Sequence, residues 1–407
     1  MMGIDLRELD WHLLAPAIIL SIIGIFLIYS AQYDATTGSS LGFYIRQLIW
    51  LVVAIVALFV VIRIPLRILD VIAYPYYLFA LLMLLLVLLV GSARMGASRW
   101  FALGPLSVSP SDIGKLAILI ALSRYFAYSK LAPESKRRLT LSALMTIIPV
   151  LLIMKQPDLG TSLVFVALLL SLWFWSGLSP YFLILIVSPL ISLLAAFHWI
   201  PWIIYLAILI FYILLLRPGL VFGFFTVVIN LAFGVFTPFV WNRLADYQKL
   251  RVLTFLDPGR DPRGAGYQII QSKIAIGSGG LLGKGYLGGS QSQLKFLPER
   301  HTDFIFSVLG EEFGLLGTTF IVLLFAYLFY HGMKIASRCR SKFASNLAWG
   351  ALTILFFQFY VNIGMTFGLM PVTGLPLPFV SYGGSSLVLA WSLIGLIILA
   401  DRNRMDY

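Results

Sequence analysis

The feature that most constrains this chain is a series of apolar runs, each long enough to cross a membrane. A helix needs about 20 apolar residues to span the hydrocarbon core of a bilayer. The runs lack the alternation of barrel strands, so helices are the structure that satisfies their backbone in lipid. We expect spans at roughly residues 12–30, 46–63, 74–91, 110–128, 140–154, 160–176, 180–198, 200–216, 219–240, 305–331, 346–369 and 382–401. The sequence therefore predicts an all-α polytopic membrane protein with about 10–12 transmembrane helices.

Composition excludes the soluble classes of protein. Of the 407 residues, 60% are hydrophobic and only 11% are charged, whereas a soluble domain has about 25% charged residues. The net charge of +12 is better explained by the positive-inside rule than by binding to nucleic acid. The single cysteine, Cys339, excludes an intramolecular disulfide. No spacing of His, Cys and Asp builds a site, so we expect no protein-held transition metal.

Basic clusters in short loops predict the orientation in the membrane. The clusters at 63–67, 130–138, 334–342 and 402–404 fall on one side if the N-terminus is cytoplasmic. We therefore expect both termini in the cytoplasm and the long segment 241–304 outside. The chain then divides into an N-terminal transmembrane bundle (1–240), an extracytoplasmic catalytic loop (241–304) and C-terminal transmembrane helices (305–407), all within one integral membrane domain. The first apolar run is expected to be an uncleaved span.

The segment 241–304 is glycine-rich at its centre, but apolar and aromatic residues are interspersed throughout it. That mixture favours a folded, partly inserted lid over a disordered linker. Its end, 297–304, reads Leu-Pro-Glu-Arg-His-Thr-Asp-Phe. Desolvation at a membrane interface raises the pKa of a carboxyl group, which suits Asp303 to act as a general base with Arg300 and His301 nearby. The alternative is structural: Thr302 or Asp303 caps a helix that begins at Phe304.

A second polar cluster precedes the fourth span. Asp112 and Lys115 are three residues apart and can pair on one helix. An ammonium inside the span either neutralises Asp112 or binds an anion. Together with Arg99, Lys115 has the chemistry to hold a pyrophosphate, although snorkelling to lipid headgroups explains these cations equally well. Glu311 and Glu312 lie in an apolar run, and we expect them to be structural, with Glu312 pairing with a cation.

Two turns rich in proline and glycine also contain candidate functional residues. In 155–161 the structural interpretation is a tight proline turn in which Asp158 caps the next helix. We adopt it for Pro157 and Gly160 and leave the role of Asp158 open. Residues 371–386 contain three prolines and end in a Gly-Gly-Ser-Ser run. A non-helical stretch within a membrane protein lines a cavity or is buried in protein. We expect a substrate or lipid groove at Ser381, Gly383 and Gly384, with a structural hairpin as the alternative.

Several ordered blocks of this chain resemble the shape, elongation, division and sporulation family of cell-wall polymerases, over nearly its whole length. The most specific blocks are Asp257-Pro258 through Gly264-Ala265-Gly266-Tyr267, Gln271 through Gly280, Leu297 through Phe304, Asn362 with Gly368-Leu369-Met370-Pro371, and Ser381-Tyr382-Gly383-Gly384-Ser385. The resemblance implies a peptidoglycan glycosyltransferase that polymerises lipid II outside the inner membrane. It also implies that Asp303 is the catalytic aspartate and that Asp112 and Lys115 matter for function.

The chain departs from the family pattern in two ways. Asp112 stands where the family usually has a glutamate, and 180–240 holds two more spans than the usual ten of the family. An added pair of spans leaves the orientation unchanged.

From the resemblance we expect Asp303 to deprotonate the acceptor hydroxyl in an inverting glycosyl transfer. Arg99, Lys115 and Lys273 would stabilise the departing lipid pyrophosphate. Whether a divalent cation also assists the departure of the pyrophosphate is left open. The expected partners are lipid II, membrane lipid and a class B penicillin-binding transpeptidase. A lipid II flippase is the rival interpretation, because interior charges and broken helices serve transport as well. A purely structural scaffold comes third.

Overall fold

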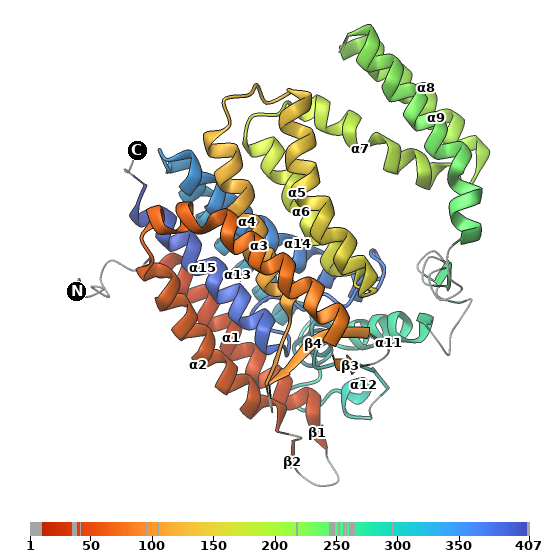
Figure 1. Ribbon diagram of the computed structural model, residues 1–407. Coiled ribbons are helices and arrows are strands. Elements are labelled where there is room, and N and C mark those ends of the chain that lie inside the picture. The colour runs from red at the N-terminus through yellow and green to blue at the C-terminus, as the bar shows by residue number, and fades with distance from the viewer. Residues whose placement is uncertain are drawn as a thin grey trace.

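The computed structural model describes residues 10–34, 39–40, 42–90, 92–94, 97–103, 106–216, 219–243, 249–250, 253–254, 257, 259, 265–294 and 296–404. Helices dominate these residues (Figure 1). The long helices are α1 (Trp11–Gln32), α2 (Phe43–Arg63), α3 (Leu66–Val90), α4 (Pro110–Tyr128), α5 (Lys136–Lys155), α6 (Leu159–Trp175), α7 (Pro180–Ala195), α8 (Trp199–Leu216), α9 (Leu220–Arg243), α13 (Ile305–Arg338), α14 (Lys342–Thr366) and α15 (Gly384–Arg402). Two shorter helices, α11 (Ala265–Ser278) and α12 (Ser290–Gln293), lie between α9 and α13.

Among the described residues, nine helices are long and apolar enough to cross a membrane. Helices α6 and α7 are apolar but shorter, at 17 and 16 residues. Helix α4 has 19 residues, but its apolar run is interrupted by Asp112, Lys115 and Arg124. The predicted all-α polytopic membrane fold is confirmed. Helix α3 begins at Leu66, earlier than the span predicted at 74–91. Pro75 lies inside it, as membrane helices allow when neighbouring groups satisfy the freed backbone.

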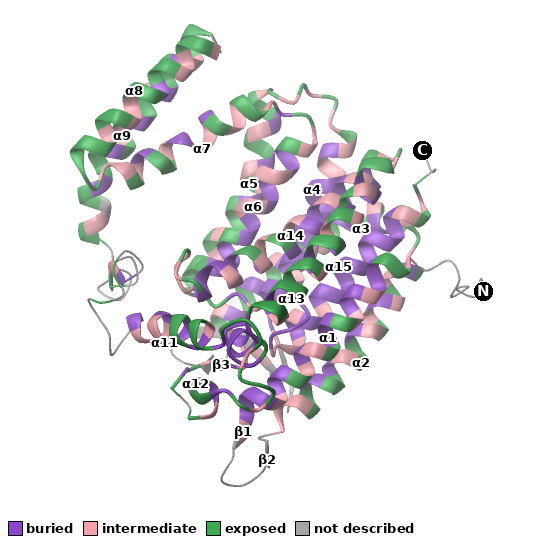
Figure 2. Ribbon diagram, turned by 180° about the vertical axis from the view of Figure 1, so that it is seen from behind, coloured by how far each residue is buried: buried purple, intermediate pink, exposed green. Residues whose placement is uncertain are grey.

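Helix α15 lies at the centre of the bundle, where it packs against α1, α2, α4, α13 and α14. It is apolar on all sides and buried along most of its length, as Figure 2 shows in purple. A helix with this pattern is stable only where protein or lipid surrounds it. Helix α8 is more apolar than α15, but Leu209 is its one buried residue among those described. Burial in this fold is therefore decided by packing partners and not by hydrophobicity alone.

Helices α7, α8 and α9 form a lobe that projects away from the other helices (Figure 1). A buried polar network joins the three helices at its centre. The Asn230 amide donates to Ser188 Oγ at 2.8 Å, and Tyr205 donates to the Ser188 carbonyl at 2.6 Å. Trp202 donates to Ser192 Oγ at 2.9 Å, and Ser192 donates to the Asn230 carbonyl at 2.7 Å. The extra spans predicted in 180–240 therefore pack mainly against one another.

Short strands, which the sequence analysis did not predict, connect some of the helices. β1 (Tyr33–Asp34) and β2 (Ser39–Ser40) pair antiparallel between α1 and α2. β3 (Ser92–Arg94), β4 (Ala97–Leu103) and β5 (Leu106–Val108) form an antiparallel three-stranded sheet between α3 and α4. Strands of two to seven residues are too short to leave a clear periodic signal in the sequence.

Helix α13 is interrupted at Gly314, whose φ of 62° is left-handed. The loop after α11 fills the interruption. Leu315 N–H donates to the Gly280 carbonyl at 2.9 Å, and Leu316 N–H donates to the Leu281 carbonyl at 3.1 Å. A Cβ at Gly314 would lie 2.4 Å from the Gly283 nitrogen, so only glycine fits. The described part of the predicted lid is thus folded onto the start of α13.

Candidate active site

Asp303 lies in a tight turn just before α13 begins at Ile305. The turn is closed by the N–H groups of Thr302 and Phe304, which donate to the Glu299 carbonyl at 3.2 and 3.3 Å. The N-cap of α13 is Phe304, and no side chain caps it. The alternative interpretation, in which Thr302 or Asp303 caps the helix, is therefore wrong. Asp303 precedes the helix and is left with a side chain available for chemistry.

The backbone of Asp303 is held from α14. Asn362, which is fully buried, donates from Nδ2 to the Asp303 carbonyl at 3.1 Å and to the Leu375 carbonyl at 2.8 Å. One amide group thus ties the Asp303 turn to the proline-rich segment before α15. Gly374 belongs to that segment and has a φ of +74°. A Cβ at Gly374 would lie 3.7 Å from Asp303 Oδ2, so the carboxylate lies directly beside this glycine.

The surroundings of the Asp303 carboxyl group favour its neutral form. Its pKa is raised from 3.8 to about 7, chiefly by burial and also by the negative charges of Glu299 and Asp158. A general base works best when its pKa is near the operating pH. The raised pKa agrees in direction with the desolvation effect expected from the sequence, and the role of Asp303 as a general base stays a prediction.

Asp158 reaches this site from the start of α6. It caps that helix, a role that the sequence left open: Thr161 N–H donates to Asp158 Oδ1 at 3.1 Å. The turn also packs closely against the proline-rich segment, because a Cβ at Gly160 would lie 2.5 Å from the Thr373 carbonyl oxygen. Asp158 therefore acts both as a cap and as a source of negative charge near Asp303.

His301 is packed between aromatic rings on the α2 side of the turn. Its ring centroid lies 5.0 Å from that of Phe43 and 5.7 Å from that of Tyr382. Burial lowers the pKa of His301, the charge of Glu299 opposes that change, and the charge of Arg300 adds to it. The imidazole is therefore mainly neutral at pH 7.

Ser381 and the two glycines after Tyr382 are hydrogen-bonded to, or packed against, other parts of the protein. Ser381 Oγ donates to the Thr302 carbonyl at 2.6 Å. The Gly383 N–H donates to Gln47 Oε1 at 3.3 Å, and a Cβ at Gly384 would lie 2.0 Å from Trp50 Cε2. These contacts fix the segment against α2. A role for Ser381, Gly383 and Gly384 in binding substrate stays a prediction.

Asp112 and Lys115 form the intrahelical pair that the sequence analysis predicted. Lys115 Nζ lies 2.8 Å from Asp112 Oδ1 in the first turns of α4, and both residues are buried. An ammonium has three donors, so two remain after this bond. The pair can therefore remain intact while Lys115 also binds an anion.

The other predicted binding residues are more dispersed. Arg300 is buried and donates to the Ser292 carbonyl, which ties the turn to α12. Lys273 is exposed on α11, and a Cβ at Gly368 would lie 2.9 Å from its Nζ. Arg99 belongs to β4, but its side chain lies outside the described residues. The structure therefore gives no position for that guanidinium relative to Asp303.

Glu311 and Glu312 are fully buried at the start of α13. Glu311 Oε1 accepts from Lys284 Nζ and from Gln291 N–H, both at 2.8 Å, so it anchors the loop that precedes it. Glu312 accepts from Ser30 Oγ on α1. The structural role predicted for this pair agrees with these contacts, but the hydrogen-bond partner found for Glu312 is a serine where a cation was expected.

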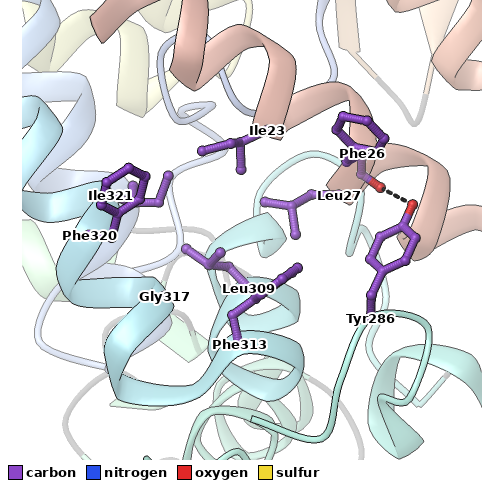
Figure 3. A pocket seen from close by; sticks show the side chains of 9 residues that line it. All are labelled: Ile23, Phe26, Leu27, Tyr286, Leu309, Phe313, Gly317, Phe320 and Ile321. Carbon is purple, nitrogen blue, oxygen red and sulfur yellow. Dashed lines mark hydrogen bonds between the residues drawn. The ribbon is translucent and has the colours of Figure 1, made fainter. Parts of the chain in front are cut away.

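An apolar groove of about 460 Å³ lies between α1 and α13 (Figure 3). Its polar edge is Tyr286, whose hydroxyl donates to the Phe26 carbonyl at 3.1 Å. The residues that line it include none of those predicted to bind substrate. Within the described part of the chain, no group of three His, Cys, Asp or Glu residues is arranged to hold a metal ion.

Sequence reasoning missed two residues that hold the site together. Asn362 was noticed only as part of a family signature, and Gln47 was not noticed at all. Gln47 is the one amide side chain in the apolar helix α2, and Asn362 is one of three amide side chains in α14. A polar residue buried in a membrane span is expensive and needs a partner, and this is the signal that could have pointed to both.

Known proteins resemble this chain over nearly its full length. A family model described as a cell cycle protein, FTSW_RODA_SPOVE, matches residues 10–204 and 202–406. The peptidoglycan glycosyltransferase MrdB of Escherichia coli K12 is 37% identical over 392 residues, covering 96% of this chain and 94% of MrdB. The peptidoglycan glycosyltransferase RodA of Treponema pallidum is 33% identical over 439 residues, covering 98% of each.

Solved structures agree with these matches. One chain, from a structure described as "Structural coordination of polymerization and crosslinking by a peptidoglycan synthase complex", has a TM-score of 0.73 and 33% identity, covering 98% of this chain and 99% of that one. The rod shape determining protein RodA of Thermus thermophilus has a TM-score of 0.65 and 28% identity, covering 98% of each. The family resemblance seen in the sequence is confirmed: this chain belongs to the FtsW, RodA and SpoVE family.

Proposed function

We propose that this protein is a peptidoglycan glycosyltransferase that polymerises lipid II into β-1,4-linked glycan strands during cell elongation. The relatives named above as peptidoglycan glycosyltransferases support the activity. The observation in this chain that carries the proposal is the environment of Asp303. Its carboxyl group has a pKa near 7 and stands in a fixed turn just before α13.

In the proposed reaction, Asp303 removes the proton from the 4-hydroxyl of the acceptor N-acetylglucosamine. That oxygen attacks the anomeric carbon of the donor N-acetylmuramic acid and forms the new glycosidic bond. The bond from the anomeric carbon to the lipid pyrophosphate breaks, and the pyrophosphate leaves with the electron pair. Attack on an α-linked donor from the opposite face gives the β product. One carboxylate is sufficient, because the reaction needs no enzyme nucleophile and the pyrophosphate leaves as an anion without a general acid.

Cationic side chains would offset the charge of the leaving pyrophosphate. Lys115 keeps two N–H donors after its bond to Asp112, which supports this role. Lys273 on the exposed face of α11 and Arg99 on β4 are the further candidates. If a divalent cation assists departure, we infer that it arrives with the pyrophosphate, because the described residues hold no cluster of three potential ligands.

We place the protein in the inner membrane with both termini cytoplasmic and the segment 241–304 outside, as the loop charges indicate. The likeness to a chain of a peptidoglycan synthase complex that coordinates polymerization and crosslinking supports a crosslinking partner. We infer that this partner is a class B penicillin-binding transpeptidase.

The distribution of charge favours a polymerase over a lipid II flippase. A transporter places its polar groups near the midplane, at broken helices open to both leaflets. Here Asp112 and Lys115 lie in the first turns of α4, and Asp303 precedes α13. Each of these groups therefore lies at a helix end, where a polar headgroup can reach it.

The test uses the purified full-length chain in proteoliposomes with labelled lipid II. We expect glycan strands that a muramidase degrades to disaccharide units. Transfer of lipid II between leaflets without strand formation would contradict the proposal and support the flippase. In the same assay Asp303→Asn should be inactive. Asp70→Asn is its matched control, because it removes a carboxylate that pairs with Arg124 on α4 and lies outside the candidate site.

A further inference from the structure

Gln47 on α2 is a buried amide that contacts the segment before α15. It is 1% exposed. Its Nε2 donates to the Ser381 carbonyl at 3.2 Å, and its Oε1 accepts from the Gly383 N–H at 3.3 Å. One side chain thus satisfies the backbone on both sides of Tyr382. A glutamine is suited to this arrangement because its amide carries a donor and an acceptor side by side.

The segment that Gln47 holds is bonded in turn to the residues just before Asp303. Tyr382 N–H donates to the His301 carbonyl at 2.9 Å, and Ser381 Oγ donates to the Thr302 carbonyl at 2.6 Å. Asn362 holds the carbonyl of Asp303 itself at 3.1 Å. The carbonyls of three consecutive residues are therefore fixed, two of them through the turn that Gln47 bonds.

We propose that Gln47 is a positioning residue for Asp303. By bonding both sides of Tyr382, it fixes the donors that hold the carbonyls of His301 and Thr302, and so it sets where the Asp303 carboxylate lies. This inference rests on the proposed function, since it assigns Gln47 a part in glycosyl transfer. Gln47 does not touch the reacting atoms, so its effect passes through the turn.

The packing around Gln47 allows this role to be tested without removing the helix contact. The Phe43 ring packs edge-on against Tyr382, with ring centroids 5.0 Å apart. Trp50 fills the space beside Gly384. These apolar contacts keep α2 against the segment when the amide is replaced. Methionine fills a similar volume but leaves the Ser381 carbonyl and the Gly383 N–H without their partner.

The experiment compares Gln47→Met with Gln358→Met in lipid II polymerisation by the full-length chain. Gln358 on α14 is another buried glutamine, 1% exposed, and its Nε2 has no hydrogen-bond partner among the described residues. We expect Gln47→Met to lower kcat by about 10- to 100-fold with KM within about twofold, since small misplacements of a catalytic group have effects of this size. We expect Gln358→Met to keep kcat within about twofold of the wild type.

Hydrogen exchange gives a second measurement on the same proteins. We expect faster amide exchange in 381–383 and 299–304 for Gln47→Met and unchanged exchange there for Gln358→Met. If Gln47→Met does not fold, Gln47→Asn retains the amide but shortens its reach, and the same losses are expected. A wild-type kcat, or a rise in KM with kcat unchanged, in the folded variant would overturn the inference. Inactivity of the wild type itself would instead refute the proposed function.

Discussion

Replacing Asp303 with asparagine should make the protein more stable at high pH. The folded protein raises the pKa of this carboxyl group from 3.8 to about 7, chiefly by burial. Above pH 7 the ionised carboxylate therefore destabilises the folded state relative to the unfolded chain. Each pKa unit corresponds to about 1.4 kcal/mol. The ionised carboxylate therefore lowers the free energy of unfolding by roughly 4 kcal/mol at pH values above the folded pKa. This value is an upper limit, because the side chain retains some contact with solvent.

The pH dependence of this gain follows from the two pKa values. Well below pH 3.8 both states hold the proton, and Asp303→Asn should match the wild type in stability. As pH rises from about 4 to 7, the unfolded state has already lost its proton while the folded state still holds it. The wild type then loses stability relative to the variant, and the gap stays constant above the folded pKa.

Thermal unfolding of the two proteins in detergent at pH 4, 6 and 8 measures this effect. We expect the Tm of Asp303→Asn to exceed that of the wild type by a few degrees at pH 8, with the gap closing toward pH 4. Asp70→Asn should show no such gain, because Asp70 is paired with Arg124 at 3.4 Å. Equal Tm values for Asp303→Asn and wild type at pH 8 would refute the reasoning about burial of this carboxylate.

Three further predictions concern activity and packing. The polymerisation rate should fall as pH drops below about 7, where Asp303 takes up its proton. Asp158→Asn should shift this fall to lower pH, because the charge of Asp158 raises the pKa of Asp303. A pH profile of initial rates checks both predictions. Lys115→Met should abolish activity and lower the free energy of unfolding by about 3–5 kcal/mol, because it leaves Asp112 buried without its partner. Adding Asp112→Asn to Lys115→Met should restore stability but not activity, as denaturation and rate assays would show. Gly160→Ala should lower the rate about tenfold because its Cβ would lie 2.5 Å from the Thr373 oxygen, whereas Gly277→Ala has open space and should match the wild type.

The membrane helices and the charged pair on α4 could be predicted because their causes are local. A bilayer forces each span to satisfy its own backbone, so hydropathy alone identifies most of the helices. Asp112 and Lys115 are three residues apart on one helix, and this spacing brings them together without help from the rest of the fold. The unusual run of charges before α13 likewise pointed to Asp303.

The contacts that hold Asp303 could not be predicted because they join distant parts of the chain. Gln47 meets the segment around Tyr382 across more than 300 residues of sequence, and a glutamine in an apolar run does not reveal its partner. The capping interpretation was wrong for a related reason. The positive φ of Glu299 (49°) closes a turn on its own carbonyl, and α13 therefore begins after Asp303.

Polymerisation of lipid II by the purified wild type and by Asp303→Asn tests the central claim most directly. Both proteins would be assayed with and without a class B transpeptidase, after their folding is matched by thermal unfolding. We predict glycan strands from the wild type and from Asp70→Asn, and a loss of at least about 1,000-fold with Asp303→Asn. Strand synthesis by Asp303→Asn at the wild-type rate would contradict the assignment of Asp303 as the general base.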